Sequence, residues 1–160
     1  MHAMTHNVEP ALTRTDILHP KLGLEELRHR LQAAGLRPTR QRLALAHLLF
    51  GNGDRHFTAE QLFQEALEQK YPPSFATIYN TLHQFAAHGL VREIALYGSR
   101  LWYDTKTGPH YHFYIEDRDE LIDIPEQMIP DLNIIAPEGL KITGVDVVVR
   151  VKSLPEGYSA

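Results

Sequence analysis

Residues Ser74–Asp104 read SFATIYNTLHQFAAHGLVREIALYGSRLWYD, and this stretch decides the fold. Its first half carries apolar side chains at the three- and four-residue spacing of one helix face: Phe75, Ile78, Leu82 and Phe85. The spacing predicts a helix over residues 74–89, which ends at a glycine. Two short runs, 91–96 and 100–104, flank a turn at 97–99 and predict a β-hairpin. A helix followed at once by a hairpin predicts a winged helix-turn-helix.

The face of this helix opposite the apolar residues is polar but uncharged. Thr77, Asn80 and Gln84 lie there and offer donors and acceptors of the kind that meet base edges in the major groove of DNA. Tyr79, at the edge of the apolar stripe, suits contact with a thymine methyl group or a phosphate, and equally a place at the edge of the core. A solvated surface helix is the alternative interpretation of the polar face.

Three further helices are predicted before this one. The first covers residues 24–34 and stops at Gly35, and the second opens near Thr39 and ends in the turn that begins at Gly51. The third opens at Thr58, whose spacing to Gln61 is that of a capping box, and is expected to end at the proline pair 72–73.

Positive charge gathers in this helical part. Residues 21–100 carry a net charge of +3 and residues 101–160 carry −6, in a chain of net charge −4. Arg37, Arg40 and Arg42 cluster at the start of the second helix and suit phosphate contact, although such a trio is also typical of a solvated face. Double-stranded DNA is therefore the expected partner. The residues predicted to contact it are Arg37, Thr39, Arg40, Arg42, Ser74, Thr77, Tyr79, Asn80 and Gln84.

The pattern changes after Asp104. Short strands are predicted at 112–115 and 120–124, then a proline-bounded segment, 125–137, and a last strand of alternating valines over 145–151. Three strands are too few to bury two faces within one copy, so a homodimer through residues 110–152 is expected.

The predicted fold class is α+β, an N-terminal winged helix-turn-helix followed by a small α/β dimerisation domain. Four parts are predicted: a flexible leader (1–20), a DNA-binding domain (21–105), a dimerisation and metal-sensing domain (106–152) and a tail (153–160).

His110-Tyr111-His112 is the sharpest local signal. On a strand these two histidines point to one side and are able to share a metal ion, whereas two ordinary surface histidines are the alternative. Asp104 and Asp123 end neighbouring strands, and His56 precedes the third helix, so all three are able to complete a site. Because the chain has no cysteine, any metal here binds through nitrogen and oxygen.

These residues resemble the ferric uptake regulators, metal-responsive dimeric repressors. The resemblance covers residues 24–152 and is carried by four segments in family order: 35–42 (GLRPTRQR), 55–60 (RHFTAE), 76–82 (ATIYNTL) and 103–112, which begins Tyr103-Asp104 and ends His110-x-His112. Within the family the chain looks like the iron response regulator (Irr) branch of alphaproteobacteria. Its branch residues are 48–51 (LLFG), 112–116 (HFYIE), 121–124 (LIDI) and the ending 137–150.

The resemblance implies a regulatory metal site at His56, Asp104, His110, His112 and Asp123. This donor set suits Fe(II) or Mn(II), and Zn(II) also binds such ligands. Ile115 and Arg118 stand where most relatives have a Cys-x-x-Cys zinc site, and Tyr111 and Val145 replace ligands of a second site. One divalent metal per subunit, with no structural cysteine zinc, is expected.

The branch likeness also implies control of iron and haem homeostasis genes. It makes His110 and His112 candidate haem ligands, although Tyr111 interrupts the histidine triplet that some relatives use and the Cys-Pro haem motif is absent. The alternative is a manganese- or peroxide-responsive repressor of the same family.

Other classes fit poorly. His110-x-His112-x-x-x-Glu116 imitates a cupin dioxygenase motif, but His112 is the last histidine of the chain and no acid-base set is assembled, so no enzyme is expected. A protein that only buffers or stores metal would not need a helix whose polar face suits contact with DNA bases. No secretory start pattern and no run of 18 apolar residues occurs, so a cytoplasmic protein without membrane contact is expected.

Overall fold

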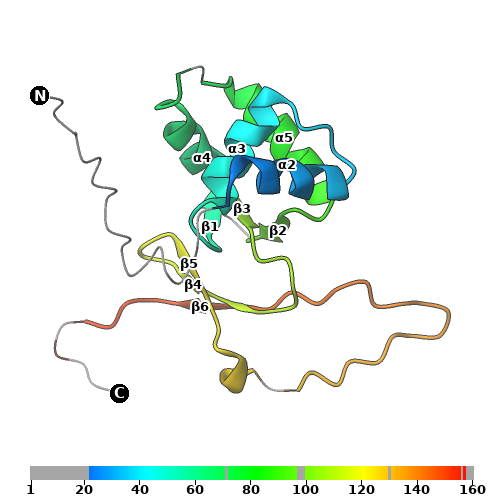
Figure 1. The fold of residues 1–160 in the computed structure, drawn as a ribbon. Coiled ribbons are helices and arrows are strands. Elements are labelled where there is room, and N and C mark those ends of the chain that lie inside the picture. The colour runs from blue at the N-terminus through cyan, green and yellow to red at the C-terminus, as the bar shows by residue number, and fades with distance from the viewer. Residues whose placement is uncertain (1–21, 71, 97–99, 130, 156, 158–160) are drawn as a thin grey trace, which may run out of the picture.

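A computed structural model describes residues 22–70, 72–96, 100–129, 131–155 and 157. The predicted leader, the hairpin turn at 97–99 and part of the predicted tail lie outside these residues. Among these residues, helices form the upper part of the molecule in Figure 1, and β-strands lie below them. The helices are α2 (Leu24–Ala33), α3 (Arg40–Phe50), α4 (Ala59–Ala66) and α5 (Phe75–Ala87). None of the described helices is long and apolar enough to cross a membrane.

Side-chain caps set where three of the helices begin. Thr39 and Ser74 accept backbone N–H bonds from the third residue after them, Arg42 and Thr77. Thr58 and Gln61 form the predicted capping box at α4. Helix α4 nevertheless ends at Ala66, several residues before the prolines that were expected to end it, and a turn follows it.

The first sheet has the order β1-β3-β2 and is antiparallel throughout. Its strands are β1 (His56–Thr58), β2 (Arg92–Ala95) and β3 (Leu101–Asp104). β2 and β3 form the predicted hairpin directly after α5, and β1 is an additional strand that was not predicted. This sheet and the helices share one apolar core, to which Phe57, Tyr103 and Phe85 belong with exposed fractions of 2% or less.

The second sheet has the order β5-β4-β6. Its strands are β4 (His112–Ile115), β5 (Glu120–Asp123) and β6 (Val148–Val151); β4 pairs antiparallel with β5 and parallel with β6. The last strand is thus shorter than predicted. The prediction of a small α/β domain was wrong for the described residues after 105, where one 3-10 turn (Glu126–Met128) is the sole helical element.

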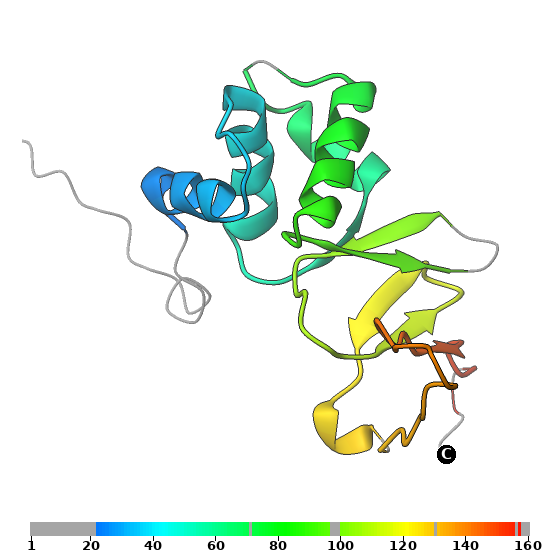
Figure 2. The ribbon, with the colours of Figure 1, turned by 90° about the vertical axis from the view of Figure 1, so that its right-hand side faces the viewer.

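The hairpin β2-β3 lies between the helices and the second sheet (Figure 2). On the side away from the helices, Ile94, Leu96 and Trp102 pack against Tyr114 and Leu121 of the second sheet in a smaller core. The hairpin is therefore in contact with both parts of the molecule.

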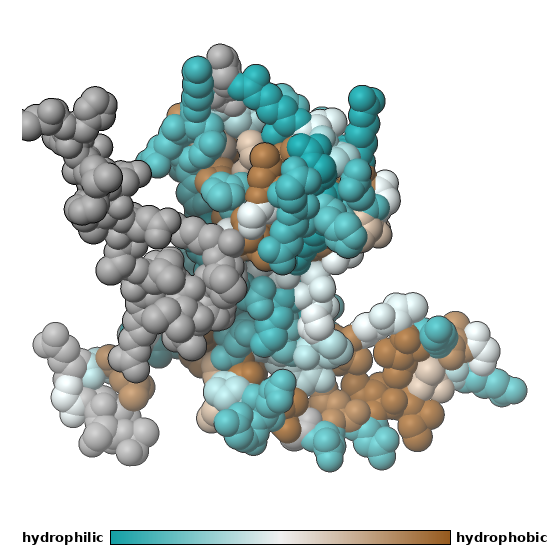
Figure 3. Space-filling view, in the orientation of Figure 1, coloured by the Kyte–Doolittle hydropathy of each residue, from teal (hydrophilic) through white to brown (hydrophobic). Residues whose placement is uncertain are grey.

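Apolar side chains remain exposed along the segment 131–147. Five of them are Leu132, Ile134, Ile135, Leu140 and Ile142, and Ile135 is 84% exposed. They form the brown band at the lower right of Figure 3. A surface of this kind in a single copy indicates an interaction site.

Candidate metal centre

The strand registers place one histidine opposite one aspartate in each sheet. His56 of β1 faces Asp104 of β3, and His112 of β4 faces Asp123 of β5. Directly opposite residues on one face of an antiparallel pair lie close enough to interact. Each sheet therefore supplies one imidazole and one carboxylate at its edge.

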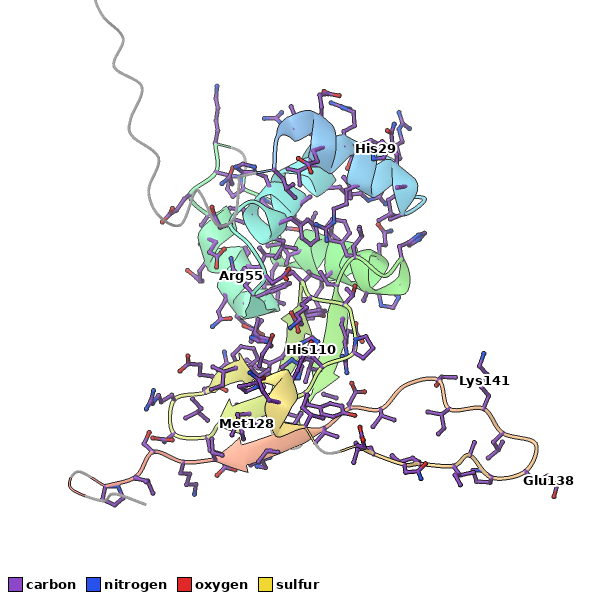
Figure 4. The ribbon with its side chains drawn as sticks, turned by 60° about the horizontal axis from the view of Figure 1, so that its bottom comes forward. His29, Arg55, His110, Met128, Glu138 and Lys141 are labelled. Carbon is purple, nitrogen blue, oxygen red and sulfur yellow. The ribbon has the colours of Figure 1, made fainter. Side chains whose placement is uncertain are left out.

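His110 completes the group from the loop before β4. The strand begins at His112, as predicted, so His110 and His112 do not share one strand, as the interpretation of the His110-x-His112 pair required. Figure 4 shows His110 between the helical part and the second sheet. One possible ligand atom from each of His56, Asp104, His110, His112 and Asp123 lies within 4.8 Å of all the others.

Two carboxylate oxygens form the middle of this group. Asp104 Oδ2 lies 2.7 Å from His110 Nε2, 3.3 Å from His112 Nε2 and 3.4 Å from His56 Nε2. Asp123 Oδ1 lies 3.0 Å from His56 Nε2 and 3.4 Å from His110 Nε2. All three imidazoles therefore present the same nitrogen to the same two oxygens.

The centre is buried at its core. Asp104, His110 and His112 are 1%, 4% and 2% exposed, so these histidines are not the ordinary surface pair that was the alternative to a metal site. Asp123 is the more open member, with about a third of its side chain exposed. A buried charge of this kind requires partners.

The protonation of His110 points to a cation in the middle. Its Nδ1 lies 2.8 Å from the carbonyl oxygen of Gly108, which accepts only, so the hydrogen-bond network assigns the proton to Nδ1. Its Nε2 then faces Asp104 Oδ2 at 2.7 Å, so these two atoms share a cation between them, which is either a proton or a metal ion.

Two buried atoms of the group support a metal ion. His56 Nε2 and Asp123 Oδ1 make no hydrogen bond although they lie 3.0 Å apart. Three nitrogens and two carboxylate oxygens form the donor set, which suits Mn(II), Fe(II) or Zn(II). The residues therefore fit a divalent metal.

The electrostatics agree with a strongly coupled cluster. Burial lowers the pKa of His56, but the nearby carboxylates of Asp104 and Asp123 outweigh it and raise the pKa above the ordinary histidine value. Burial raises the pKa of Asp104, but the nearby imidazoles of His112 and His56 and the backbone N–H of Lys106 hold it well below the usual range. Both carboxylates are ionised at neutral pH, because the pKa of Asp123 is lowered as well.

Residues outside the predicted set hold the ligands in place. Lys106 contacts both aspartates: its backbone N–H donates to Asp104 Oδ1 at 2.8 Å, and its Nζ donates to Asp123 Oδ2 at 2.9 Å. Arg92 of the hairpin donates to the carbonyl oxygens of Gly108 and His110 and pairs with Asp146. In the sequence, Lys106 lies between the predicted ligands Asp104 and His110, and this position was the one sequence signal for its role at the site.

The residues predicted to contact DNA are distributed over the starts of α3 and α5 and one face of α5. A shallow groove is lined by five of them, Thr39, Arg42, Thr77, Asn80 and Gln84, together with Gln41 and Thr81. Arg42 donates to Oε1 of Gln84 and, at 2.9 Å, to the carbonyl of Arg37, so it joins α3 to α5.

The other predicted DNA contacts lie outside this groove. Tyr79 is 40% exposed and packs edge-on against Phe75. Arg37, Arg40 and Ser74 are exposed, and Ser74 is engaged as the cap of α5. Gln41, which the sequence analysis omitted, gave no signal besides its place between two arginines.

Comparison with known proteins identifies the family of the chain. Residues 33–150 match the ferric uptake regulator family. The peroxide-responsive repressor PerR of Staphylococcus aureus (strain Mu50) is 36% identical over 125 residues, which cover 78% of this chain and 81% of that repressor.

Two solved structures share the fold. The ferric uptake regulator of Vibrio cholerae has a TM-score of 0.64 at 24% identity, covering 79% of this chain and 98% of that one. The regulator of Pseudomonas aeruginosa, solved with manganese, has a TM-score of 0.61 at 24% identity, covering 79% and 96%.

Proposed function

Because the chain belongs to the ferric uptake regulator family, we propose that it is a metal-responsive transcriptional regulator that binds double-stranded DNA. One observation supports this most directly. Two of the five candidate ligands, His56 and Asp104, belong to the sheet that packs on the helices, whereas the others come from the segment beyond residue 105. A metal ion at this place joins the two parts.

The shared core carries the effect of the metal to the DNA-binding helix. Helix α5, proposed here as the recognition helix, packs through Phe85 into the same core as Phe57 of β1 and Tyr103 of β3. When bound, the metal supplies the positive charge that the two aspartates face. Fixing β1 and β3 against the second sheet then fixes the orientation of the recognition helix, which docks in the major groove.

Dimerisation is the second part of the proposal. The exposed apolar side chains of segment 131–147, with Ile122 and Val149 of the second sheet, offer a surface for a second copy. A two-fold dimer places two recognition helices on a palindromic operator. The DNA-contacting set is Arg37, Thr39, Arg40, Arg42, Ser74, Thr77, Tyr79, Asn80 and Gln84.

The proposed ligand is one divalent ion per subunit, Fe(II) or Mn(II), held by His56, Asp104, His110, His112 and Asp123. Zn(II) competes for the same atoms because it ranks high in the affinity order of divalent ions. Elemental analysis of the loaded protein tests the stoichiometry, and two ions per subunit would contradict it.

A peroxide-responsive repressor is the alternative function, and the name and 36% identity of the Staphylococcus aureus relative favour it. Fe(II) reacts readily with hydrogen peroxide and Mn(II) does not. Under this alternative, peroxide releases DNA from the Fe(II)-loaded protein and leaves the Mn(II)-loaded protein bound. Equal responses of the two forms would reject it.

A haem-responsive role of the Irr kind is a finer proposal, motivated by the branch resemblance. Because His110 and His112 are buried with their Nε2 atoms turned to the centre, haem binds them only in exchange for metal. Haem should then displace metal and release DNA. A Soret band that is unchanged in the His110→Ala/His112→Ala double variant would reject these ligands.

The decisive experiment for the proposed function is a gel shift on an operator selected from a random duplex library. Metal-free, Mn(II)-loaded and haem-loaded protein are compared on the selected DNA and on a scrambled duplex. The proposal expects a palindromic site that the Mn(II)-loaded dimer binds more tightly than the metal-free protein does. Equal binding of the selected and scrambled duplexes would reject it.

A further inference from the structure

Lys106 contacts both aspartates of the metal centre through different groups. Its backbone N–H donates a hydrogen bond to Asp104 Oδ1 at 2.8 Å, and its ammonium group donates one to Asp123 Oδ2 at 2.9 Å. The remaining oxygens, Asp104 Oδ2 and Asp123 Oδ1, face the histidine nitrogens. Each carboxylate therefore has one inner oxygen toward the centre and one outer oxygen bonded to Lys106.

This division restricts how the carboxylates bind a metal ion. A carboxylate that coordinates with both oxygens must turn both toward the ion, whereas an oxygen held by a hydrogen bond on the far side keeps the group to one-oxygen coordination. With one atom from each of the five side chains, the protein supplies five ligand atoms. An ion that prefers six ligands keeps one position for a molecule from solvent.

We propose that Lys106 is a positioning residue that keeps both aspartates to one-oxygen coordination and so preserves one position on the metal for water or another small neutral or anionic ligand. The inference rests on the proposed metal site but not on DNA binding. A surface hollow bordered by His56, Gln61 and Trp102 lies beside the centre.

A substitution at Lys106 removes one of its two contacts and keeps the other. Replacing the side chain removes the bond to Asp123 and leaves the backbone bond to Asp104 in place. In Lys106→Met the second oxygen of Asp123 is released to coordinate the metal. Because the lysine side chain is 41% exposed, its removal leaves little buried space to fill.

Mn(II) alone is the probe for the test. Water-proton relaxation counts the exchangeable waters on protein-bound Mn(II), and the electron paramagnetic resonance spectrum reports the symmetry of its ligands. The wild-type protein should keep about one exchangeable water per ion. Lys106→Met should lose it and change the spectrum, whereas Lys106→Arg, which retains a cationic donor, should keep it.

Lys152→Met is the matched control, because it removes a lysine charge that pairs with Glu116 away from the centre. A purely electrostatic role of Lys106 would change Mn(II) affinity with salt dependence but leave the water count and the spectrum unchanged. The proposal is overturned by a water count in Lys106→Met equal to that of the wild type, or by a wild-type ion without exchangeable water. The assay contains no DNA, so failure of the proposed regulatory function leaves this result intact.

Discussion

Removing the side chain of Leu121 should loosen the contact between the hairpin and the second sheet while leaving the helical core folded. Leu121 is 4% exposed on β5 and packs in the small core with Ile94, Trp102 and Tyr114. The helices have a separate core, to which this leucine does not belong. The substitution Leu121→Ala therefore targets the junction between the two parts.

The expected cost follows from burial. Buried leucine-to-alanine substitutions cost about 2–5 kcal/mol of unfolding free energy, and the lower half of this range applies because the small core lies near the surface and is able to relax. With a urea m-value of about 1–3 kcal/mol per molar, a loss of ~2–3 kcal/mol lowers the urea midpoint by roughly 0.7–3 M. Leu24→Ala is the control, because Leu24 is 58% exposed and its loss should cost less than about 0.5 kcal/mol.

Two probes separate the two parts in a urea titration. Trp102, the one tryptophan of the chain, is 3% exposed in the small core, so its fluorescence reports the junction. Far-ultraviolet circular dichroism reports the helices. In metal-free Leu121→Ala the fluorescence midpoint should fall below the dichroism midpoint, and Mn(II) should restore it because its ligands span both sheets. If both midpoints stay at the wild-type values, the junction does not depend on this core.

Three further predictions concern single residues. Thr58→Ala removes the capping box of α4 and should lower the unfolding free energy by about 1–2 kcal/mol in a denaturant titration. Thr58→Ser, which keeps the hydroxyl group, should lower it less. An unchanged unfolding midpoint in Thr58→Ala would contradict the role of the cap. In binding titrations on single-base operator variants, Asn80→Ala should lower the DNA-binding free energy by about 1–3 kcal/mol and relax specificity at one base position. Arg37→Ala should instead weaken binding to all sequences alike and reduce its salt dependence. If both variants lose affinity equally for all operators, Asn80 does not read a base. Because Asp104 and Asp123 raise the pKa of His56 in the metal-free protein, protonated His56 stabilises the fold below about pH 6.5, and this contribution disappears as the pH rises through the raised pKa. The melting temperature of the metal-free protein relative to His56→Gln should thus fall as the pH rises above about 6.5. Mn(II) affinity should rise over the same change, since the metal needs neutral imidazole, and parallel trends would contradict this assignment.

The helices were predictable because their signals are local. Thr39, Thr58 and Ser74 accept the capping hydrogen bonds from which α3, α4 and α5 begin, and apolar spacing identifies the buried faces. Strand β1 was not predictable in this way. Three residues, His56-Phe57-Thr58, are too short to show alternation, and they are a strand only because β3 pairs with them.

Long-range pairing also explains the errors beyond residue 105. The predicted last strand began at Val145, but β4 offers partners only to Val148–Val151. The α/β class predicted for this domain implied a helix that was assigned to no segment, and among the described residues after 105 the structure has only the 3-10 turn Glu126–Met128. The five candidate ligands followed from residue type and family resemblance, whereas the contact of Lys106 with Asp123, 17 positions away, depends on the folded arrangement of the sheets.

In the proposed mechanism, one metal ion couples the second sheet to the recognition helix through His56. Linkage requires the coupling to be reciprocal, so two titrations measure it: Mn(II) binding with and without operator, and operator binding with and without Mn(II). In the wild type, each ligand should raise the affinity for the other by the same factor, about 5–150-fold, which corresponds to a coupling free energy of ~1–3 kcal/mol. His56→Ala should reduce both factors toward one. Full operator binding by the metal-free wild type, or an undiminished factor in His56→Ala, would contradict the account.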